Sequence, residues 1–219
     1  MRHVPICVFG EVLFDRFPEG HAVLGGAPFN VAWHLNAFGE RPYFKSAVGN
    51  DAPGSQIRMA MLDWGMEVQG LDTDPDHPTG VVTVTLIDGE PNYDIVPGRA
   101  YDHMQPAPSG LTCELLYHGT LALRGPLSAQ ALESFKAQRP DTIFLDVNLR
   151  APWWDREQVI ALVEGADWVK LNRDELNLLS GASGHQTEGD LQARARTFAE
   201  AHGLQGLILT LGAQGALGL

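Results

Sequence analysis

Short runs of apolar residues alternate along the chain with longer segments in which apolar residues recur at helical spacing. Such runs are typical of buried strands, and the helical spacing is typical of helices that present one face to a core. The pattern predicts strands at residues 5–10, 43–48, 115–118, 142–147, 168–171 and 207–211, and helices at 28–38, 55–64, 128–138, 156–164, 173–179 and 189–201. This order predicts an α/β fold with a mainly parallel sheet and helices on both faces, whose ligands bind beyond the carboxyl ends of the strands.

One segment departs from this rhythm. Residues 80–87 are rich in β-branched side chains, Asp88-Gly89 is a two-residue turn signal, and residues 92–96 have the pattern of a returning strand. A hairpin inserted in an alternating chain predicts a small β-sheet that projects from the main layer. Because no repeat, low-complexity segment or linker interrupts the pattern, we expect a single domain over residues 1–219.

Composition narrows the class of protein. A hydrophobic content of 44% over 219 residues is ordinary for a globular protein with a core. The net charge of -12 argues against a nucleic-acid groove or an anionic-membrane surface, because both require basic patches. It does not exclude nucleotides, since helix N-termini and Mg²⁺ supply local positive potential. We therefore expect a small-molecule partner, with neither nucleic acid nor membrane.

The cysteines and the N-terminal segment indicate the compartment. Cys7 and Cys113 each lie in or beside an apolar run, which favours two buried thiols in reducing cytoplasm over a disulfide. Residues 1–17 contain two acidic residues and no small-residue cleavage site, so they are interpreted as a first strand and not as a signal peptide. The expected location is the cytoplasm.

Polar residues follow the first predicted strand. A carboxylate there, such as Glu11 or Asp15, can accept hydrogen bonds from sugar hydroxyls, although two solvated surface acids would look the same in the sequence. The segment 25–32 (GGAPFNVA) favours a ligand. Its two glycines let the backbone approach a ligand at a helix N-terminus, and Asn30 offers both a donor and an acceptor to a polyol.

Taken in full, residues 25–39 (GGAPFNVAWHLNAFG) resemble the N-terminal signature of the ribokinase (pfkB) carbohydrate kinases. Further matches follow in the family's order: the sugar-binding aspartate at Asp15, the G-x-D-x-x-G turn at 49–54, the D-x-N-x-R segment at 146–150, the N-x-x-E element at 172–175 and the T-x-G-x-x-G turn at 210–215. The D-x-N-x-R segment is similar to that of the fructokinase-like branch. The resemblance runs from about residue 6 to residue 219.

The resemblance implies a ribokinase-like three-layer sandwich, a β lid formed by about residues 12–24 and 78–97, and transfer of a phosphoryl group from ATP, with Mg²⁺, to a sugar hydroxyl. It implies that the sugar is held by Asp15, Gly25, Gly26, Asn30, Asp146, Asn148 and Arg150. It assigns the nucleotide to Lys170, Asn172, Thr210, Gly212 and Gly215, and the metal environment to Glu175. From the residues alone, 172–175 could equally be a helix cap with a solvated glutamate.

The sugar itself is left open. The start of the chain and the D-x-N-x-R segment favour fructose, whereas residues 89–96 (GEPNYDIV) depart from the usual fructokinase lid pattern. Ribose, 2-keto-3-deoxygluconate and nucleosides remain alternatives. The resemblance also implies a homodimer formed through the lid.

The family's catalytic base is an aspartate in a later G-A-G-D motif, and residues 1–219 contain no such motif. We therefore expect a chain that is incomplete at its C-terminus, where Leu219 lies in the start of a strand, with weak or absent turnover and with uncovered apolar sheet surface that reduces stability. A non-catalytic sugar- or nucleotide-binding module derived from a kinase is the alternative. A nicotinamide-dependent oxidoreductase would need G-x-G-x-x-G after the first strand, which is absent there.

Overall fold

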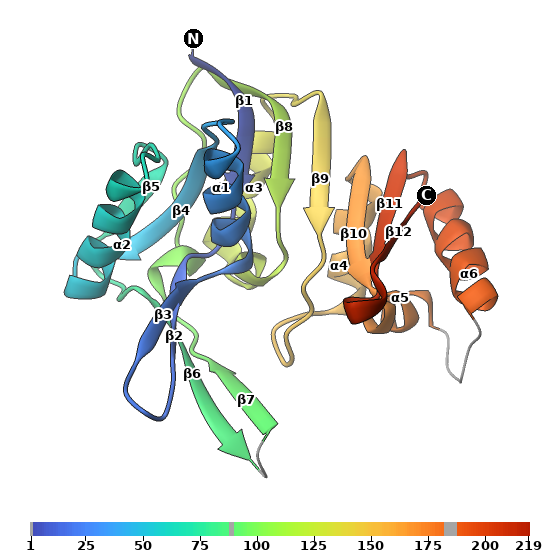
Figure 1. Ribbon diagram of the computed structural model, residues 1–219. Helices are drawn as coiled ribbons and strands as arrows, with labels where there is room; N and C mark the ends of the chain where they lie inside the picture. Colours follow the sequence, from blue (N-terminus) through green and yellow to red (C-terminus); the bar gives the residue numbers. More distant parts are fainter. Residues whose placement is uncertain (1, 88–89, 182–187) are drawn as a thin grey trace.

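The computed structural model describes residues 2–87, 90–181 and 188–219, which form two sheets and their covering helices (Figure 1). The main sheet has eight strands in the order β12-β11-β10-β9-β8-β1-β4-β5, all parallel except β12, which is antiparallel to β11. Its strands are β1 (Arg2–Phe9), β4 (Tyr43–Gly49), β5 (Leu71–Asp74), β8 (Leu111–His118), β9 (Thr142–Asp146), β10 (Trp168–Asn172), β11 (Gly206–Thr210) and β12 (Ala216–Gly218).

A second, smaller sheet projects below the main one in Figure 1. Its strands are β2 (Leu13–Arg16), β3 (Ala22–Gly25), β6 (Gly80–Ile87) and β7 (Glu90–Ile95), in the order β3-β2-β6-β7. The predicted hairpin is confirmed, because β6 and β7 pair antiparallel. The predicted Asp88-Gly89 turn lies outside the described residues. The sheet is built from the two segments, about 12–24 and 78–97, that were expected to form a lid.

Helices cover both faces of the main sheet, as predicted. They are α1 (Ala27–Ala37), α2 (Ala52–Asp63), α3 (Pro126–Lys136), α4 (Arg156–Glu164), α5 (Arg173–Ser180) and α6 (Glu188–Ala201), with short 3₁₀ turns η1 (Ala100–Asp102), η2 (Leu121–Arg124) and η3 (Gly212–Gln214). α1 and α2 bury Phe29 and Met61 against one face of β1 and β4. α3 packs Phe135 against the opposite face, and α4, α5 and α6 continue that layer over β9, β10 and β11.

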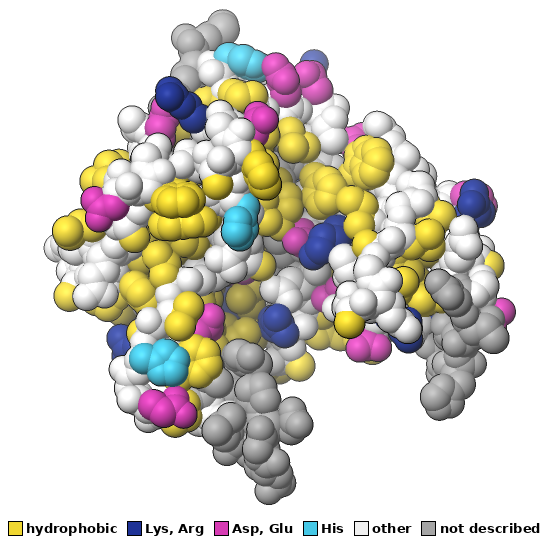
Figure 2. Space-filling model, in the orientation of Figure 1, with side chains coloured by type: hydrophobic (Ala, Val, Ile, Leu, Met, Phe, Trp, Pro, Cys, Tyr) yellow, Lys and Arg dark blue, Asp and Glu magenta, His cyan; other side chains and the backbone are white. Residues whose placement is uncertain are grey.

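The α1 side of β9, β10 and β11 is different. Within the described residues no helix lies over this part of the sheet (Figure 1), and Phe144, Trp168 and Ile208 on it are only half-buried. The space-filling view in Figure 2 shows hydrophobic side chains across the middle of this face. The described chain therefore buries both faces of β1 and β4 but leaves part of the apolar surface of β9–β11 open to solvent.

Three strands were not predicted as strands from the apolar pattern: β2, β3 and β5. Each has only four residues, and β5 (LDTD) alternates a leucine and a threonine with two aspartates, so it carries no apolar run. The chain end, predicted to begin a strand, does so in β12. Cys7 and Cys113 are free and buried. None of the described helices combines the length and the apolar character needed to cross a membrane.

Candidate functional site

A cavity of about 260 Å³ opens where the carboxyl end of β1 meets the small sheet and the N-terminus of α1. Five of the residues predicted to hold a sugar line it: Asp15, Gly26, Asn30, Asn148 and Arg150. The remaining lining residues are Glu11, Leu13, Ala27, Val82, Ile95 and Leu121. A few polar groups set in apolar walls are the usual composition of a small-molecule site, and this volume suits a ligand of modest size.

Glycine allows the N-terminus of α1 to approach this cavity. Gly26, the N-cap of α1, has φ +110°, and a Cβ there would lie 2.5 Å from the carbonyl oxygen of Glu11. A Cβ on Gly25 would lie 3.1 Å from a carboxylate oxygen of Asp15. Because Gly26 leaves no room for a side chain and Gly25 leaves little, the first turn of α1 lies directly beside the carboxyl groups.

Asn148 and Arg150 reach the cavity from the loop that follows β9. Thr120 fixes this loop, since its hydroxyl donates to the carbonyl oxygen of Asn148 at 2.8 Å and accepts from the amide of Asn148 at 3.1 Å. The Arg150 guanidinium lowers the pKa of Asp15, but burial raises it by more, so the net pKa of Asp15 lies above its ordinary value. Asp15 therefore contributes a partly buried carboxylate to the cavity, and Arg150 contributes an opposing cation.

Glu11 is not a solvated surface acid, contrary to one interpretation of the sequence. Its exposed fraction is only 2%, and burial raises its pKa to about 7. The nearby charge of Asp146 also raises this pKa, whereas Arg124 and hydrogen bonds with the backbone of Glu11 and Ala27 lower it. A carboxyl group in this environment changes its protonation state near neutral pH.

Arg124 ties the small sheet to the main one. Its guanidinium donates to the Asp102 carboxylate at 2.9 Å, to the Tyr101 hydroxyl at 2.8 Å and to the carbonyl oxygen of Val96 at 2.8 Å. It also lies over the ring of Trp153, 4.8 Å from the ring centroid. The guanidinium thus joins the segment after β7 to the loop after β9, two parts of the chain that border the cavity.

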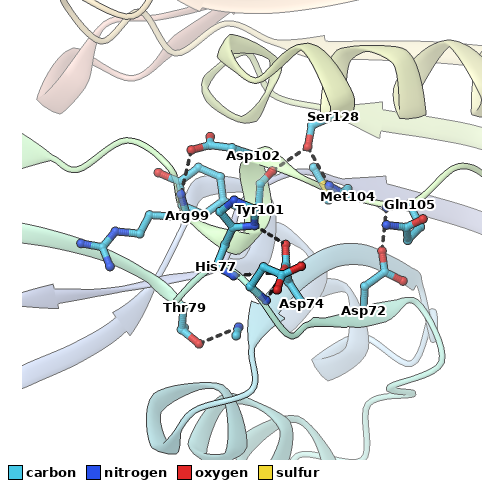
Figure 3. Close-up of polar contacts among 12 residues, drawn as sticks. Asp72, Asp74, His77, Thr79, Arg99, Tyr101, Asp102, Met104, Gln105 and Ser128 are labelled. Atoms are coloured by element: carbon cyan, nitrogen blue, oxygen red, sulfur yellow. Dashed lines mark hydrogen bonds and ion pairs between the residues drawn. The ribbon is translucent and has the colours of Figure 1, made fainter.

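Further polar contacts hold residues 101–105, which lead from the small sheet back to β8, and Thr79, next to the start of β6 (Figure 3). Ser128 accepts from the amide of Met104 at 3.0 Å and donates to the carbonyl oxygen of Tyr101 at 2.8 Å. The amide of Gln105 donates to Asp72 at 2.9 Å. The hydroxyl of Thr79, just before β6, accepts from the amide of Gly49 at 2.9 Å. These bonds anchor the small sheet where it leaves the main sheet.

A second polar cluster lies farther along the carboxyl edge, at the ends of β8, β9 and β10. One oxygen of Asp146 accepts from Tyr117 and the other from Lys170, both at 2.5 Å. Asp146, which was predicted to hold the sugar, is buried and bonded to these two partners. It is not among the cavity-lining residues. Lys170 is 37% exposed, so its ammonium group is accessible to a ligand at this edge.

Asn172 and Glu175 form a capping box at the start of α5. The side chain of Asn172 accepts from the amide of Glu175 at 2.9 Å, and Glu175 accepts from the amide of Asn172 at 2.8 Å. The second oxygen of Glu175 accepts from the amide of Leu149 at 3.1 Å. Glu175 is buried, and burial raises its pKa. The helix-cap interpretation of this motif is therefore confirmed, although its glutamate is not solvated.

The remaining predicted nucleotide residues follow β11. Thr210 is the register partner of Asn172 across β10 and β11. Gly212 and Gly215 have φ +60° and +96° and bound the 3₁₀ turn η3. Both positive φ values favour glycine, which explains the two glycines of the T-x-G-x-x-G string. Thr210 and Asn172 therefore lie side by side at the carboxyl ends of the adjacent strands β11 and β10, with Lys170 two residues earlier on β10.

Two residues around the site gave no signal in the sequence. Tyr117 is one of the last residues of β8, so it could have been expected at the carboxyl edge, but an aromatic residue in an apolar run looks like core. Arg124 lies in η2, a segment without periodicity. Among the described residues, no group of three or more histidine, cysteine, aspartate or glutamate side chains could hold a metal ion.

Comparison with known proteins gives a consistent result. The model of the pfkB family carbohydrate kinases matches residues 6–219. The chain is 30% identical over 229 residues to fructokinase from Escherichia coli, covering 97% of this chain and 72% of that protein. It spans less of the plant relatives, for example 62% of fructokinase-2 of Solanum habrochaites.

Solved structures share the fold. Fructokinase from Vibrio cholerae O395, in its fructose, ADP and calcium ion bound form, superposes with a TM-score of 0.81 and 27% identity, over 99% of this chain and 73% of that one. Aminoimidazole riboside kinase from Salmonella enterica, complexed with aminoimidazole riboside and an ATP analogue, superposes with a TM-score of 0.80 and 26% identity. The match covers 100% of this chain and 73% of that one. With the motifs in order and the same α/β architecture, the chain belongs to the pfkB family of carbohydrate kinases.

Proposed function

We propose that this site serves the phosphorylation of a sugar hydroxyl by ATP, and that fructose is its preferred sugar. The observation that carries the proposal is the cavity at the carboxyl edge of the sheet, in which Asp15, Asn30, Asn148 and Arg150 face one small volume beside the N-terminus of α1. Carboxylate, amide and guanidinium groups together match the donors and acceptors of a polyol. Membership of a carbohydrate kinase family supports the same conclusion.

The sugar would be oriented mainly by Asp15 and Asn30, with the backbone of Gly25 and Gly26 close enough to bond it directly. In phosphoryl transfer, a protein contributes chiefly by positioning the reactants and by stabilising the charge of the transferred group. The strands β2 and β6 place Leu13 and Val82 against the cavity, so the small sheet would exclude water from the sugar as a lid.

The nucleotide would lie along the ends of β10 and β11, near Lys170, Asn172, Thr210, Gly212 and Gly215. Lys170 is the partly exposed cation that would meet phosphate oxygens. Mg²⁺ neutralises charge on the phosphates when it is bound with the nucleotide. Both oxygens of Glu175 already accept backbone N–H groups, so Glu175 fits contact with a metal-bound water better than direct ligation. Asp146 would position Lys170 rather than touch the sugar.

The proton of the reacting hydroxyl requires a base. The family resemblance places it in a G-A-G-D motif, which these 219 residues do not contain. We propose that the chain by itself binds its ligands but turns over weakly or not at all. We further propose that the protein works in the cytoplasm and that the small sheet mediates a homodimer, with Val23, 49% exposed on β3, as one contact residue.

Sugars other than fructose are also candidate substrates, because the structurally similar aminoimidazole riboside kinase is complexed with a riboside. The test is ADP release by the purified chain with Mg-ATP and a panel of D-fructose, D-ribose, 2-keto-3-deoxygluconate and nucleosides. It is run beside a chain extended by the coding sequence that follows residue 219. Turnover by the extended chain alone supports the proposal, and equal turnover by both places the base within the present residues.

Sugar binding is measured in parallel by titration calorimetry. We expect Asp15→Asn to abolish detectable binding and the matched exposed substitution Asp63→Asn, at the end of α2, to leave it unchanged. If both chains bind sugar and nucleotide and neither releases ADP, the non-catalytic module replaces the kinase. If no sugar binds, the cavity has been assigned wrongly.

A further inference from the structure

The carboxyl group of Glu11 has one oxygen that the fold leaves unused. Glu11 follows β1 and lines the same cavity as Asp15 and Asn30. It is 2% exposed, and its Oε2 has no hydrogen-bond partner among the described residues. A buried carboxyl oxygen without a partner is unfavourable, because the protein has removed its water without replacing it. A ligand that donates a hydrogen bond to this oxygen would remove the cost.

The structural role of Glu11 does not explain this oxygen. The carboxyl group interacts with the backbone of Glu11 itself and of Ala27, the first residue of α1. No side chain caps α1 at Gly26, so Glu11 supplies a negative group at the positive end of that helix. This role needs only one oxygen. Glu11 lines the cavity together with the polar residues Asp15, Asn30, Asn148 and Arg150 and the apolar residues Leu13, Val82, Ile95 and Leu121, so its carboxyl group borders the same volume as the other polar groups.

We infer that the unpaired oxygen of Glu11 accepts a hydrogen bond from a hydroxyl group of the bound sugar. This inference rests on the proposed function and adds a substrate-binding residue to it. Asp15, Asn30 and Glu11 would then surround one sugar from β2, from α1 and from the end of β1. Two carboxylates suit a neutral polyol, whose hydroxyls can each donate, and they disfavour an anionic ligand in the same place.

The decisive variant is Glu11→Gln, which keeps the side-chain length and one oxygen for the N-terminus of α1. Where the unpaired oxygen was, it can place an NH₂ group that cannot accept. Isothermal titration of the full chain with D-fructose, at about one pH unit above the pKa of Glu11 so that its carboxyl group is ionised, should show affinity reduced by about tenfold or more, the range for losing a hydrogen bond to a charged group. Glu200→Gln, the same change at an exposed position of α6, should not alter the affinity.

Binding of Mg-ADP provides a second readout, since nucleotide affinity should be equal in wild type and E11Q if the fold is intact. Monodeoxy analogues of fructose then identify the hydroxyl group. One analogue should bind more weakly than fructose to the wild type, because it lacks the hydroxyl group that donates to Glu11. The same analogue should bind E11Q as well as fructose does, because E11Q cannot form that hydrogen bond with either sugar.

Three results separate the possibilities. Fructose affinity in E11Q equal to wild type, or losses for every analogue that are the same in both proteins, overturns the role of Glu11 and leaves the proposed function intact. If the wild type binds none of the sugars in the panel, both proposals fail together. If E11Q loses nucleotide binding as well, the titration is repeated with Glu11→Asp, which keeps the charge on a shorter side chain. Unchanged fructose affinity in a folded E11D then also overturns the inference.

Discussion

Replacing Gly26 by alanine tests whether the close approach of α1 to the cavity is as tight as the structure shows. Gly26 has φ +110°, a conformation that L-residues rarely adopt and that costs about 1–3 kcal/mol for a non-glycine residue. The new Cβ would also lie 2.5 Å from the carbonyl oxygen of Glu11, a backbone atom that cannot rotate away. Overpacking of this kind costs about 1–3 kcal/mol more. The total, about 2–6 kcal/mol, is a large part of the 5–15 kcal/mol by which domains are typically stable.

Urea unfolding followed by circular dichroism measures the free energy of unfolding of G26A directly. Gly65→Ala is the matched control, because Gly65 has φ +74° and a Cβ there would meet nothing within 4 Å. We expect G65A to lose about 1–2 kcal/mol from backbone strain alone. The difference between the two variants is the contribution of the clash with Glu11. If G26A is no less stable than G65A, the contact between Gly26 and Glu11 is looser than described, and the reasoning about the cavity fails with it.

Three further predictions follow from the geometry. Asn172→Ala removes half of the capping box and should lower the free energy of unfolding by about 1 kcal/mol, whereas Asn172→Asp keeps a side-chain acceptor at the N-cap and should lose less; equal losses would contradict the assignment. Burial raises the pKa of Glu11 from 4.5 to about 7 and lowers that of His118 from 6.5 to about 4. The stability from Glu11 is present below pH 4.5 and is lost as the pH rises toward 7, while that from His118 is present above pH 6.5 and is lost as the pH falls toward 4. The two slopes oppose each other, so in E11Q stability should rise between these limits by up to about 1.4 kcal/mol per pH unit more than in wild type; parallel curves would refute the burial of Glu11. Finally, Val23→Glu on the exposed side of β3 should shift a dimer toward monomer in sedimentation equilibrium, and the same mass distribution in both proteins would place the interface elsewhere.

The elements of the fold could be predicted from the sequence wherever the apolar pattern was long enough. The predicted helix at 156–164 coincides with α4, and the predicted strand at 43–48 differs from β4 by one residue. Capping chemistry was equally legible, since Asn172 and Glu175 form the box that their spacing allowed. These features are local: each depends on neighbours within a few residues, and the chain displays those neighbours directly.

The composition of the cavity depends on contacts that are distant in sequence and was only partly predicted. The motifs indicated Asp15, Asn30 and Asn148, but the environment of Glu11 depends on the backbone of Ala27 in α1 and on the charge of Arg124 from η2. Nothing around residue 124 distinguishes an arginine that binds three groups from one that is solvated. For Asp146 the motif indicated the carboxyl edge of the sheet, but it did not show that Tyr117 and Lys170 each donate to one of its oxygens, because both partners come from other strands.

The arrangement of charge along the sheet edge supports separate places for the two proposed substrates. Carboxylates gather at the β1 and β2 end, where Glu11 and Asp15 line the cavity, and a phosphate group there would be repelled. Lys170 lies on β10, two strands away from β8. Its side chain is 37% exposed, but its ammonium group is paired with Asp146 at 2.5 Å, so Asp146 offsets part of the charge that a phosphate group would meet. A sugar bound by carboxylates and a nucleotide bound by Lys170 would meet between them, at Asn148 and Arg150. The phosphorylated product would then carry its new negative charge toward Glu11 and Asp15, which favours its release.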